Sequence, residues 1–299
     1  MKILITGSAG FIGSALKDFL EKQDIEVIPY DLKDAPANDT RDLANLRVKM
    51  AQADGVVHLA AVSRVKWAFE DPLACIHTNV GGTINVLEAI RQAHGKQPWV
   101  IFGSSREVFG ESRPLPVTEE TPCHPMNVYG VAKIAGEDLC KIFAKDYGLK
   151  TRTLRFSNVY TSSRDQLDRV IPKFILRAAK NEDIIINGTG QETFDFTYIQ
   201  DTISGIWGCI QEIQKSQRPY DDFILPKRIP TTLREYAEII NKVLASKSEI
   251  KYAQGRSYDV NKFYADPAKA KQFLGFNPST ALEEGIGLVI RDFKKEKII

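Results

Sequence analysis

The chain has 299 residues, of which 43% are hydrophobic and 26% charged, and its net charge of +2 gives no reason to expect nucleic acid or a membrane surface as a partner. Its four cysteines and four histidines are scattered without ligand spacing, which argues against a metal site and a disulfide framework and favours free thiols in the cytoplasm. No apolar stretch approaches the roughly 20 residues of a transmembrane helix, and the N-terminus shows no signal-peptide pattern.

The first half of the chain alternates short apolar runs with longer segments of helical periodicity. The predicted strands cover residues 2–6, 26–30, 55–61, 98–105 and 150–159, and the predicted helices cover 11–22, 75–93 and 129–148. Because strands that alternate with helices form βαβ units, this order predicts an α/β fold with a doubly wound, mostly parallel sheet and helices on both faces.

Past residue 160 the pattern becomes shorter and more irregular. Residues 161–169 and 187–193 are polar or turn-rich and predict loops, whereas 281–297 has the periodicity of a final helix. We therefore expect a first domain over 1–165, to which some later segments at about 195–215 return, and a smaller substrate-binding region over 166–299.

Three glycines follow the first predicted strand and open the first predicted helix. Gly7 allows a tight turn, Gly10 lets the backbone approach a pyrophosphate, and Gly13 lets the helix pack closely on the strand. The helix N-terminus offers free N–H groups and a positive dipole end to that anion. Asp31, at the end of the second predicted strand, is placed to bind the adenosine ribose and favours NAD over NADP, a preference that Lys33 weakens slightly. The pattern predicts a Rossmann-type NAD-binding domain.

Tyr129 and Lys133 are four residues apart in a predicted helix, so both side chains emerge on one face. A free phenol is a poor base at neutral pH, and a nearby ammonium group lowers its pKa. The pair therefore predicts a proton shuttle for a carbinol beside oxidised nicotinamide. Ser104 and Ser105 end a predicted strand, where ligands gather in parallel sheets, and Ser105 is expected to orient the substrate oxygen. A solvated helix face and an ordinary loop serine are the structural alternatives.

Further motifs run nearly end to end and carry a family resemblance. They are GSAGFIG (7–13), DTRDL (39–43), HLAA (58–61), NVGGTINVLEA (79–89), SSREVFG (104–110), YGVAK (129–133), LRFSNVY (154–160), NGTGQETFDFTYIQD (187–201) and LGFNPSTALEEGI (274–286). On these stretches the chain resembles extended short-chain dehydrogenases/reductases of the NAD-dependent nucleotide-sugar epimerase/dehydratase family, in particular its UDP-glucose 4-epimerase-like members. The resemblance implies that Ser105, Tyr129 and Lys133 form a catalytic triad.

The resemblance also implies where the ligands bind. The residues that it implies for NAD binding are the three glycines with Phe11 and Ile12, together with Tyr129 and Lys133. It also implies Asp42 and Leu43 near the adenine, Leu59, Ala60 and Ala61 along the cofactor, and Asn79 near the nicotinamide ribose. For a nucleotide-sugar substrate it implies Ser104, Ser105, Asn158, Arg256 and, placed to meet a ribose, Asp259. Family members commonly form homodimers through two helices of each subunit, here predicted at 79–94 and 129–147.

The resemblance implies a first step in which Tyr129 takes a proton from a sugar hydroxyl while hydride passes to NAD, giving a keto-sugar. A 4-epimerase returns the hydride to the other face. A 4,6-dehydratase uses an Asp-Glu pair, which here reads Arg106-Glu107; Glu107 can still remove a proton, but Arg106 cannot act as a general acid. We expect a 4-epimerase, with a dehydratase that uses Glu107 alone or a 4-ketoreductase as alternatives. A non-enzymatic NAD-binding protein would not need Tyr129 and Lys133.

The chain departs from the family pattern at Phe194, where an arginine usually binds the substrate diphosphate. Arg256 retains a second family arginine. Arg164, Arg169 and Lys173 are candidates to replace the lost contact, or the substrate differs from a standard diphosphate sugar. The segment RFSNVYTSS (155–163) also lacks the family's usual glycine after Tyr160, so the substrate loop is expected to run differently.

Overall fold

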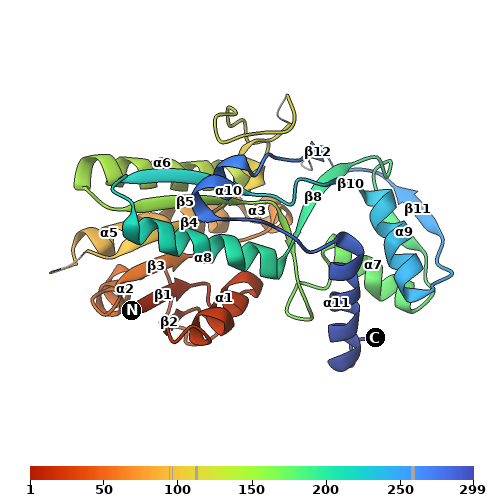
Figure 1. The fold of residues 1–299 in the computed structure, drawn as a ribbon, viewed down its shortest axis with the longest axis horizontal. Coiled ribbons are helices and arrows are strands. Elements are labelled where there is room, and N and C mark those ends of the chain that lie inside the picture. Colours follow the sequence, from red (N-terminus) through yellow and green to blue (C-terminus); the bar gives the residue numbers. More distant parts are fainter. Residues whose placement is uncertain (94, 96, 112–113, 257–259) are drawn as a thin grey trace.

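The computed structural model describes residues 1–93, 95, 97–111, 114–256 and 260–299 (Figure 1). Its large sheet is parallel throughout and has the strand order β2-β1-β3-β4-β5-β9. These strands are β1 (Lys2–Thr6), β2 (Glu26–Tyr30), β3 (Gly55–His58), β4 (Trp99–Ser105), β5 (Thr151–Phe156) and β9 (Tyr220–Leu225). The predicted α/β fold with a doubly wound parallel sheet is confirmed.

Helices cover both faces of this sheet. On one face lie α1 (Phe11–Glu21) and α8 (Ile199–Lys215), and on the other lie α2 (Leu43–Met50), α5 (Gly82–Arg91) and α6 (Val128–Tyr147). Successive residues of β1 point to opposite faces, so Ile3 and Ile5 enter the core under α1 and α8, while Leu4 enters the core under α2, α5 and α6. Both faces are buried, which explains the continuous apolar runs of the strands.

The predicted helix over 75–93 is divided into three pieces. These are the end of α4 (Pro72–Ile76), a π-helical turn at His77–Gly81 and α5, and a separate short helix, α3 (Val65–Glu70), precedes them. Within that turn the buried Asn79 amide accepts a hydrogen bond from Val62 N at 2.7 Å and donates one to Val62 O at 3.1 Å. The turn thereby fixes the loop that follows β3.

A second group of elements packs against the carboxyl end of the large sheet. A small sheet contains β6 (Asn158–Tyr160), β8 (Thr193–Tyr198), β10 (Pro230–Thr232) and β12 (Lys262–Phe263), and β7 (Ile184–Asn187) pairs with β11 (Ile250–Ala253). The remaining helices are α7 (Val170–Ala179), α9 (Leu233–Leu244), α10 (Ala268–Leu274) and α11 (Leu282–Lys295), with a 3-10 turn at Arg106–Val108. Figure 1 shows α7, α9 and β11 together at the end of the molecule far from α5.

Two later segments return to the large sheet. α8 packs on β4 and β5. β9 adds a sixth strand beside β5, and the sequence did not reveal this return. Among the described residues, no helix combines the length and the hydrophobicity of a membrane span.

Candidate active site

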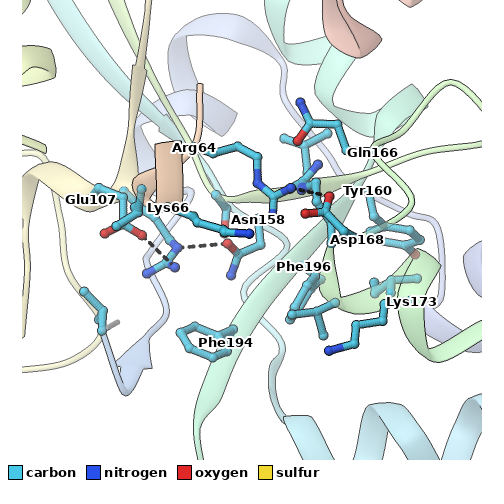
Figure 2. A pocket seen from close by; sticks show the side chains of 18 of the residues that line it. Arg64, Lys66, Glu107, Asn158, Tyr160, Gln166, Asp168, Lys173, Phe194 and Phe196 are labelled. Atoms are coloured by element: carbon cyan, nitrogen blue, oxygen red, sulfur yellow. Dashed lines mark hydrogen bonds and ion pairs between the residues drawn. The ribbon is translucent and has the colours of Figure 1, made fainter. Parts of the chain in front are cut away.

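Two adjoining cavities open at the carboxyl edge of the large sheet. The glycine-loop cavity, about 340 Å³, lies between the loop after β1 and the loops after β2 and β3. The outer cavity, about 350 Å³, lies between the ends of β4 and β6 and the elements around α7 (Figure 2). We call the residues common to both linings the shared wall, and these are Phe11, Ile12, Ser63, Ser104, Tyr129, Phe156 and Gln166.

The glycine loop is closed to any larger residue. Gly7 has a φ of +73°, and a Cβ added there would lie 2.7 Å from Ala60 N. A Cβ added at Gly13 would lie 2.1 Å from Gly7 O. The loop therefore brings bare backbone and the N-terminus of α1 to the cavity, which suits a pyrophosphate.

Asp31 ties this loop to the end of β2. Its Oδ2 accepts a hydrogen bond from Ala9 N at 3.1 Å, and its Oδ1 accepts one from Lys33 N at 2.9 Å. Asp31 also lines the glycine-loop cavity, and each carboxylate oxygen has a further lone pair for a ribose hydroxyl. The residues present therefore fit a dinucleotide with an unphosphorylated ribose.

Most of the predicted cofactor residues line the glycine-loop cavity. They are Gly7, Gly10, Phe11, Ile12, Gly13, Asp31, Leu59, Ala60, Ala61, Tyr129 and Lys133. Asp42, Leu43 and Asn79 are not in the described lining. Asp42 instead accepts hydrogen bonds from Ala44 N and Asn45 N as the N-cap of α2, and Asn79 is occupied by Val62. The wall there is formed by Asp39, Thr40 and Arg41, which belong to the DTRDL motif but were not assigned to the cofactor, and by Thr78, which directly precedes the 79–89 motif.

Tyr129, Lys133 and Ser105 are brought together by α6 and β4. Asn127 caps α6 by accepting a hydrogen bond from Gly130 N at 2.9 Å, which places Tyr129 in the first turn. Lys133 is buried and its Nζ donates to Gly103 O at 2.7 Å, 5.8 Å from the centroid of the Tyr129 ring. Ser105 forms a hydrogen bond with Tyr129. The structure therefore brings Ser105, Tyr129 and Lys133 together.

The acidity of the phenol differs from the sequence expectation. Burial raises the pKa of Tyr129, a hydrogen bond with Ser105 lowers it, and the charge of Glu107 raises it further. Burial also lowers the pKa of Lys133 to about 8. The expected lowering of the Tyr129 pKa is wrong for the protein alone, because desolvation of the phenolate outweighs the nearby charge.

Arg106, Glu107 and Asn158 form one cluster in the outer cavity. Arg106 Nε donates to Asn158 Oδ1 at 2.9 Å, and Nη2 lies 2.8 Å from Glu107 Oε1. Asn127 Nδ2 donates to Glu107 Oε2 at 2.9 Å. Figure 2 marks the first two of these interactions by the dashed lines at Glu107 and Asn158. The predicted base Glu107 and substrate residue Asn158 therefore both have protein partners, and neither partnership was evident from the sequence.

The other predicted substrate residues have different surroundings. Ser104 lines both cavities, but its hydroxyl is already engaged, because it donates to the buried Glu137 Oε1 at 2.5 Å. Arg256 lines the outer cavity and is exposed. Asp259 lies outside the described residues.

Two of the three candidates to replace the missing family arginine line the outer cavity, namely Arg169 and Lys173. Arg164 is not in the described lining and forms an ion pair with Asp18 at 2.6 Å. Burial and then the charges of Arg177 and Arg256 lower the pKa of Lys173, which indicates a cluster of cations on the α7 side of the cavity.

The parallel sheet, the glycine cradle and the buried Ser-Tyr-Lys constellation define an NAD-dependent enzyme of the short-chain dehydrogenase/reductase type. Residues 3–222 match the model of the NAD dependent epimerase/dehydratase family, and the chain therefore belongs to this family. The prediction of an NAD-dependent enzyme of nucleotide-sugar epimerase type is thereby confirmed.

Several similar proteins illustrate this relationship. A Methanocaldococcus jannaschii protein provisionally named as a UDP-glucose 4-epimerase is 32% identical over 308 residues, covering 98% of both chains. The Thermotoga maritima UDP-glucose 4-epimerase with UDP-glucose has a TM-score of 0.91 at 28% identity, covering 99% of this chain and 100% of that one. A mutant of Bacillus cereus UDP-glucuronic acid 4-epimerase, in complex with UDP-4-deoxy-4-fluoro-glucuronic acid and NAD, has a TM-score of 0.90 at 25% identity and covers 99% and 100%.

Proposed function

We propose that the protein interconverts the C4 epimers of a uridine diphosphate hexose. The observation that carries this proposal is the position of Tyr129 in the shared wall, within reach of both a dinucleotide and a sugar. The similar Thermotoga maritima and Bacillus cereus proteins, whose complexes hold UDP-sugars, support uridine diphosphate as the carrier.

The chain's own residues divide the work between binding and proton transfer. Gly7, Gly10 and Gly13 would hold the pyrophosphate of NAD, and Asp31 would hold its adenosine ribose. When bound, NAD supplies reversible hydride transfer at a sugar carbon. Tyr129 exchanges the proton of the sugar hydroxyl, and Ser105 orients that hydroxyl.

The buried ammonium group of Lys133 is needed because the phenol is difficult to ionise. Burial raises the pKa of Tyr129, so its phenolate forms only when positive charge lies beside it. Lys133 supplies part of that charge from the next turn of α6. Its hydrogen bond to Gly103 O fixes the ammonium group against β4.

An elimination reaction is less well served by this site. The Glu107 carboxylate is held by Arg106 and Asn127, and a guanidinium group is not suited to act as a general acid. A dehydratase needs a group here that gives up a proton to the leaving hydroxyl. A 4-ketoreductase would use the same triad but would convert external nicotinamide stoichiometrically.

The test compares the wild type with Tyr129→Phe, using UDP-hexoses and NMR to identify the products. The variant should lose about 10²- to 10⁴-fold in turnover while keeping its NAD, because only the proton shuttle is removed. Tyr147→Phe is the matched control, since this exposed tyrosine ends the same helix. Undiminished epimerisation by Tyr129→Phe, or net formation of NADH by the wild type, would contradict the proposal.

We further propose a homodimer formed through α5 and α6. Ile84 on α5 and Val131 and Ile142 on α6 are exposed apolar side chains, with exposed fractions of 41%, 47% and 48%. They lie on the helices that the sequence predicted for the dimer contact. A second copy of this face would remove them from water.

The division of labour along the chain is also a proposal. Residues 1–165, together with the returning α8 and β9, would hold NAD, and the rest of 166–299 would shape the substrate site. We also propose a cytoplasmic location, because all four cysteines are free thiols and a reducing compartment keeps them so.

A further inference from the structure

Glu137 is a buried carboxylate to which the proposed reaction assigns no part. It lies on α6, one turn beyond Lys133, and its side chain has an exposed fraction of 0%. It belongs to the described lining of neither cavity. Burying a carboxylate is costly unless charges and hydrogen bonds compensate it, so the partners of Glu137 indicate what the carboxylate does.

Glu137 and Lys133 tie two consecutive turns of α6 to two consecutive residues of β4. Glu137 Oε1 accepts a hydrogen bond from Ser104 Oγ at 2.5 Å, and Lys133 Nζ donates one to the carbonyl oxygen of the preceding residue at 2.7 Å. The next residue of the strand, Ser105, bonds Tyr129 in the first turn of the helix. The contact between Ser105 and Tyr129 is therefore one of three that fix how α6 lies on β4.

A guanidinium group holds the carboxylate of Glu137 from the neighbouring strand. Arg155 on β5 is the register partner of Ser104, and its Nε and Nη2 donate to Glu137 Oε1 and Oε2 at 3.0 Å and 2.7 Å. Arg155 Nη2 also lies 2.9 Å from Asp222 Oδ2 on β9, and its Cζ lies 5.2 Å from the ring centroid of Phe109. Because the guanidinium is anchored on several sides, the carboxylate has a fixed position one turn from the catalytic lysine.

We propose that Glu137 is a positioning residue for Tyr129 and Lys133: its carboxylate braces α6 against β4 through Ser104 and balances the ammonium group of Lys133. This inference rests on the proposed function, because it gives a part in the proton shuttle to a residue that lies outside both cavities. Arg155 acts through Glu137 by holding the carboxylate in place.

The other titratable groups nearby do not balance the ammonium group. Those that face Lys133 are Tyr129, Glu137 and Cys140 on α6, Cys75 on α4 and His58 on β3, and those that face Glu137 also include Arg155 on β5, Tyr220 on β9 and Cys123. Burial raises the pKa of the three thiols and of both phenols and lowers the pKa of the imidazole to about 3, so all of these are neutral at pH 7.

Glu137 is thus the member of this set that counters the desolvation of Lys133 at neutral pH. Burial lowers the pKa of Lys133 to about 8, and negative charge on Cys75, Glu137 or Cys140 opposes this shift. Without the charge of Glu137 the lysine would release its proton at a lower pH. The positive charge of Arg155, then less well compensated, would act in the same direction.

The first test needs no substrate. Lys133→Met removes the cost of burying the ammonium group at pH values where the folded lysine is charged. The stabilising effect of Lys133→Met, measured by urea unfolding, should begin to decline at a pH about 0.5–1 unit lower in a Glu137→Gln background than in the wild type. Glutamine keeps the shape of the side chain and an acceptor for Ser104, so the charge is what changes.

Two control backgrounds separate the charge of Glu137 from its hydrogen bond. Ser104→Ala removes the hydrogen bond and keeps the charge, so the pH dependence of Lys133→Met should be that of the wild type. Asp138→Asn, at the next position of α6, removes an exposed carboxylate that pairs with Lys141 and should also leave it unchanged. An unshifted pH dependence in Glu137→Gln, or an equal shift in Ser104→Ala, would overturn the inference.

A double variant covers the case in which Glu137→Gln does not fold. Glu137→Gln/Arg155→Gln removes both charges of the ion pair, and Asp222 keeps Lys269 as a partner at 3.1 Å. It should show a smaller shift in the same direction, because the carboxylate is one helical turn from Lys133. No shift in this background would count against the inference.

The second test measures epimerisation of UDP-glucose between pH 6 and 10. In Glu137→Gln the alkaline decline of kcat should begin about 0.5–1 unit lower than in the wild type, so kcat should lose about 3- to 10-fold more at pH 9 than at pH 6.5, with KM changed less than about 2-fold. Ser104→Ala should lower kcat at every pH without moving the decline. A loss in Glu137→Gln that is the same at every pH, or a wild-type kcat in Ser104→Ala, would overturn the inference.

The two tests distinguish this inference from the proposed function. A wild type that epimerises no UDP-hexose overturns the epimerase proposal, and the unfolding measurements still decide whether Glu137 balances Lys133. A wild type that epimerises UDP-glucose while Glu137→Gln leaves both pH dependences unchanged overturns the assignment of Glu137 and keeps the epimerase proposal.

Discussion

At the scale of single residues, the buried ammonium group of Lys133, which the proposed reaction needs, lowers the stability of the folded protein. The side chain is buried, and burial lowers its pKa from 10.5 to about 8. Below pH 8 the lysine is charged in both the folded and the unfolded chain, so folding bears the full cost of desolvating the ammonium group. Above pH 8 the folded protein releases the proton first, and the cost disappears as pH approaches the unfolded pKa.

Lys133→Met is therefore expected to be more stable and inactive. A lysine whose pKa falls this far on folding loses about 3 kcal/mol of stability at pH 7, and the lost hydrogen bond to Gly103 O offsets about 1 kcal/mol. Urea unfolding at pH 7 should show a gain of about 2 kcal/mol that shrinks by pH 9.5. Lys141→Met, at an exposed position of the same helix, should show no such pH dependence. An equal gain at both pH values would refute the explanation.

At the scale of elements, the contact between α1 and the loop after β1 depends on Gly13. A Cβ at this position would lie 2.1 Å from Gly7 O and 2.9 Å from Gly7 C, both backbone atoms that cannot move aside cheaply. Gly13→Ala should therefore destabilise the fold by about 1–3 kcal/mol and weaken NAD binding at least about 10-fold. Thermal unfolding and calorimetry with NAD measure the two effects.

The matched control for this variant is Gly81→Ala. Gly81 has helical dihedral angles, and a Cβ there meets no described atom within 4 Å outside its own helix. Alanine should be neutral or stabilise the protein by up to about 1 kcal/mol. If both alanine variants lose NAD binding, the close approach at Gly13 is not the cause.

The sequence predicted the elements best where the signal was local. Apolar runs and glycine spacing located the first five strands and α1, because each is encoded by consecutive residues. The return of β9 depends on pairing with a strand about 70 residues earlier, and no local pattern specifies such a partner. The π-helical turn at His77–Gly81 likewise arises from the tertiary contact of Asn79 with Val62.

The candidate site was likewise predictable where the signal was local and not where it depends on tertiary contacts. The spacing of Tyr129 and Lys133 predicted their shared face, and the structure places both beside the glycine loop. The direction of the Tyr129 pKa shift could not be read in the same way, because it depends on how completely the surrounding elements exclude water. The position of the Arg106 guanidinium depends on Asn158 and Phe194, which lie far away in the chain and come near only in the folded protein.

At the scale of the whole molecule, the proposed dimer makes a direct prediction. Light scattering should give twice the chain mass of 33.5 kDa for the wild type. Val131→Glu/Ile142→Glu should give the mass of a single chain, because two buried carboxylates would face apolar surface across the contact. Ile229→Glu, at an exposed position away from α5 and α6, should remain dimeric. A wild type of 33.5 kDa would exclude the dimer.

The shared wall links two recognition tasks in a way that limits how the molecule can change. Four of its residues line both cavities, namely Phe11, Tyr129, Phe156 and Gln166. A substitution there that enlarges one cavity therefore also changes how the other cavity binds its ligand. Evolution toward a new sugar would therefore proceed through positions that border the outer chamber alone, such as Arg106 and Phe194. The hydride and proton transfer at the sugar carbon would then be retained while the sugar specificity changes.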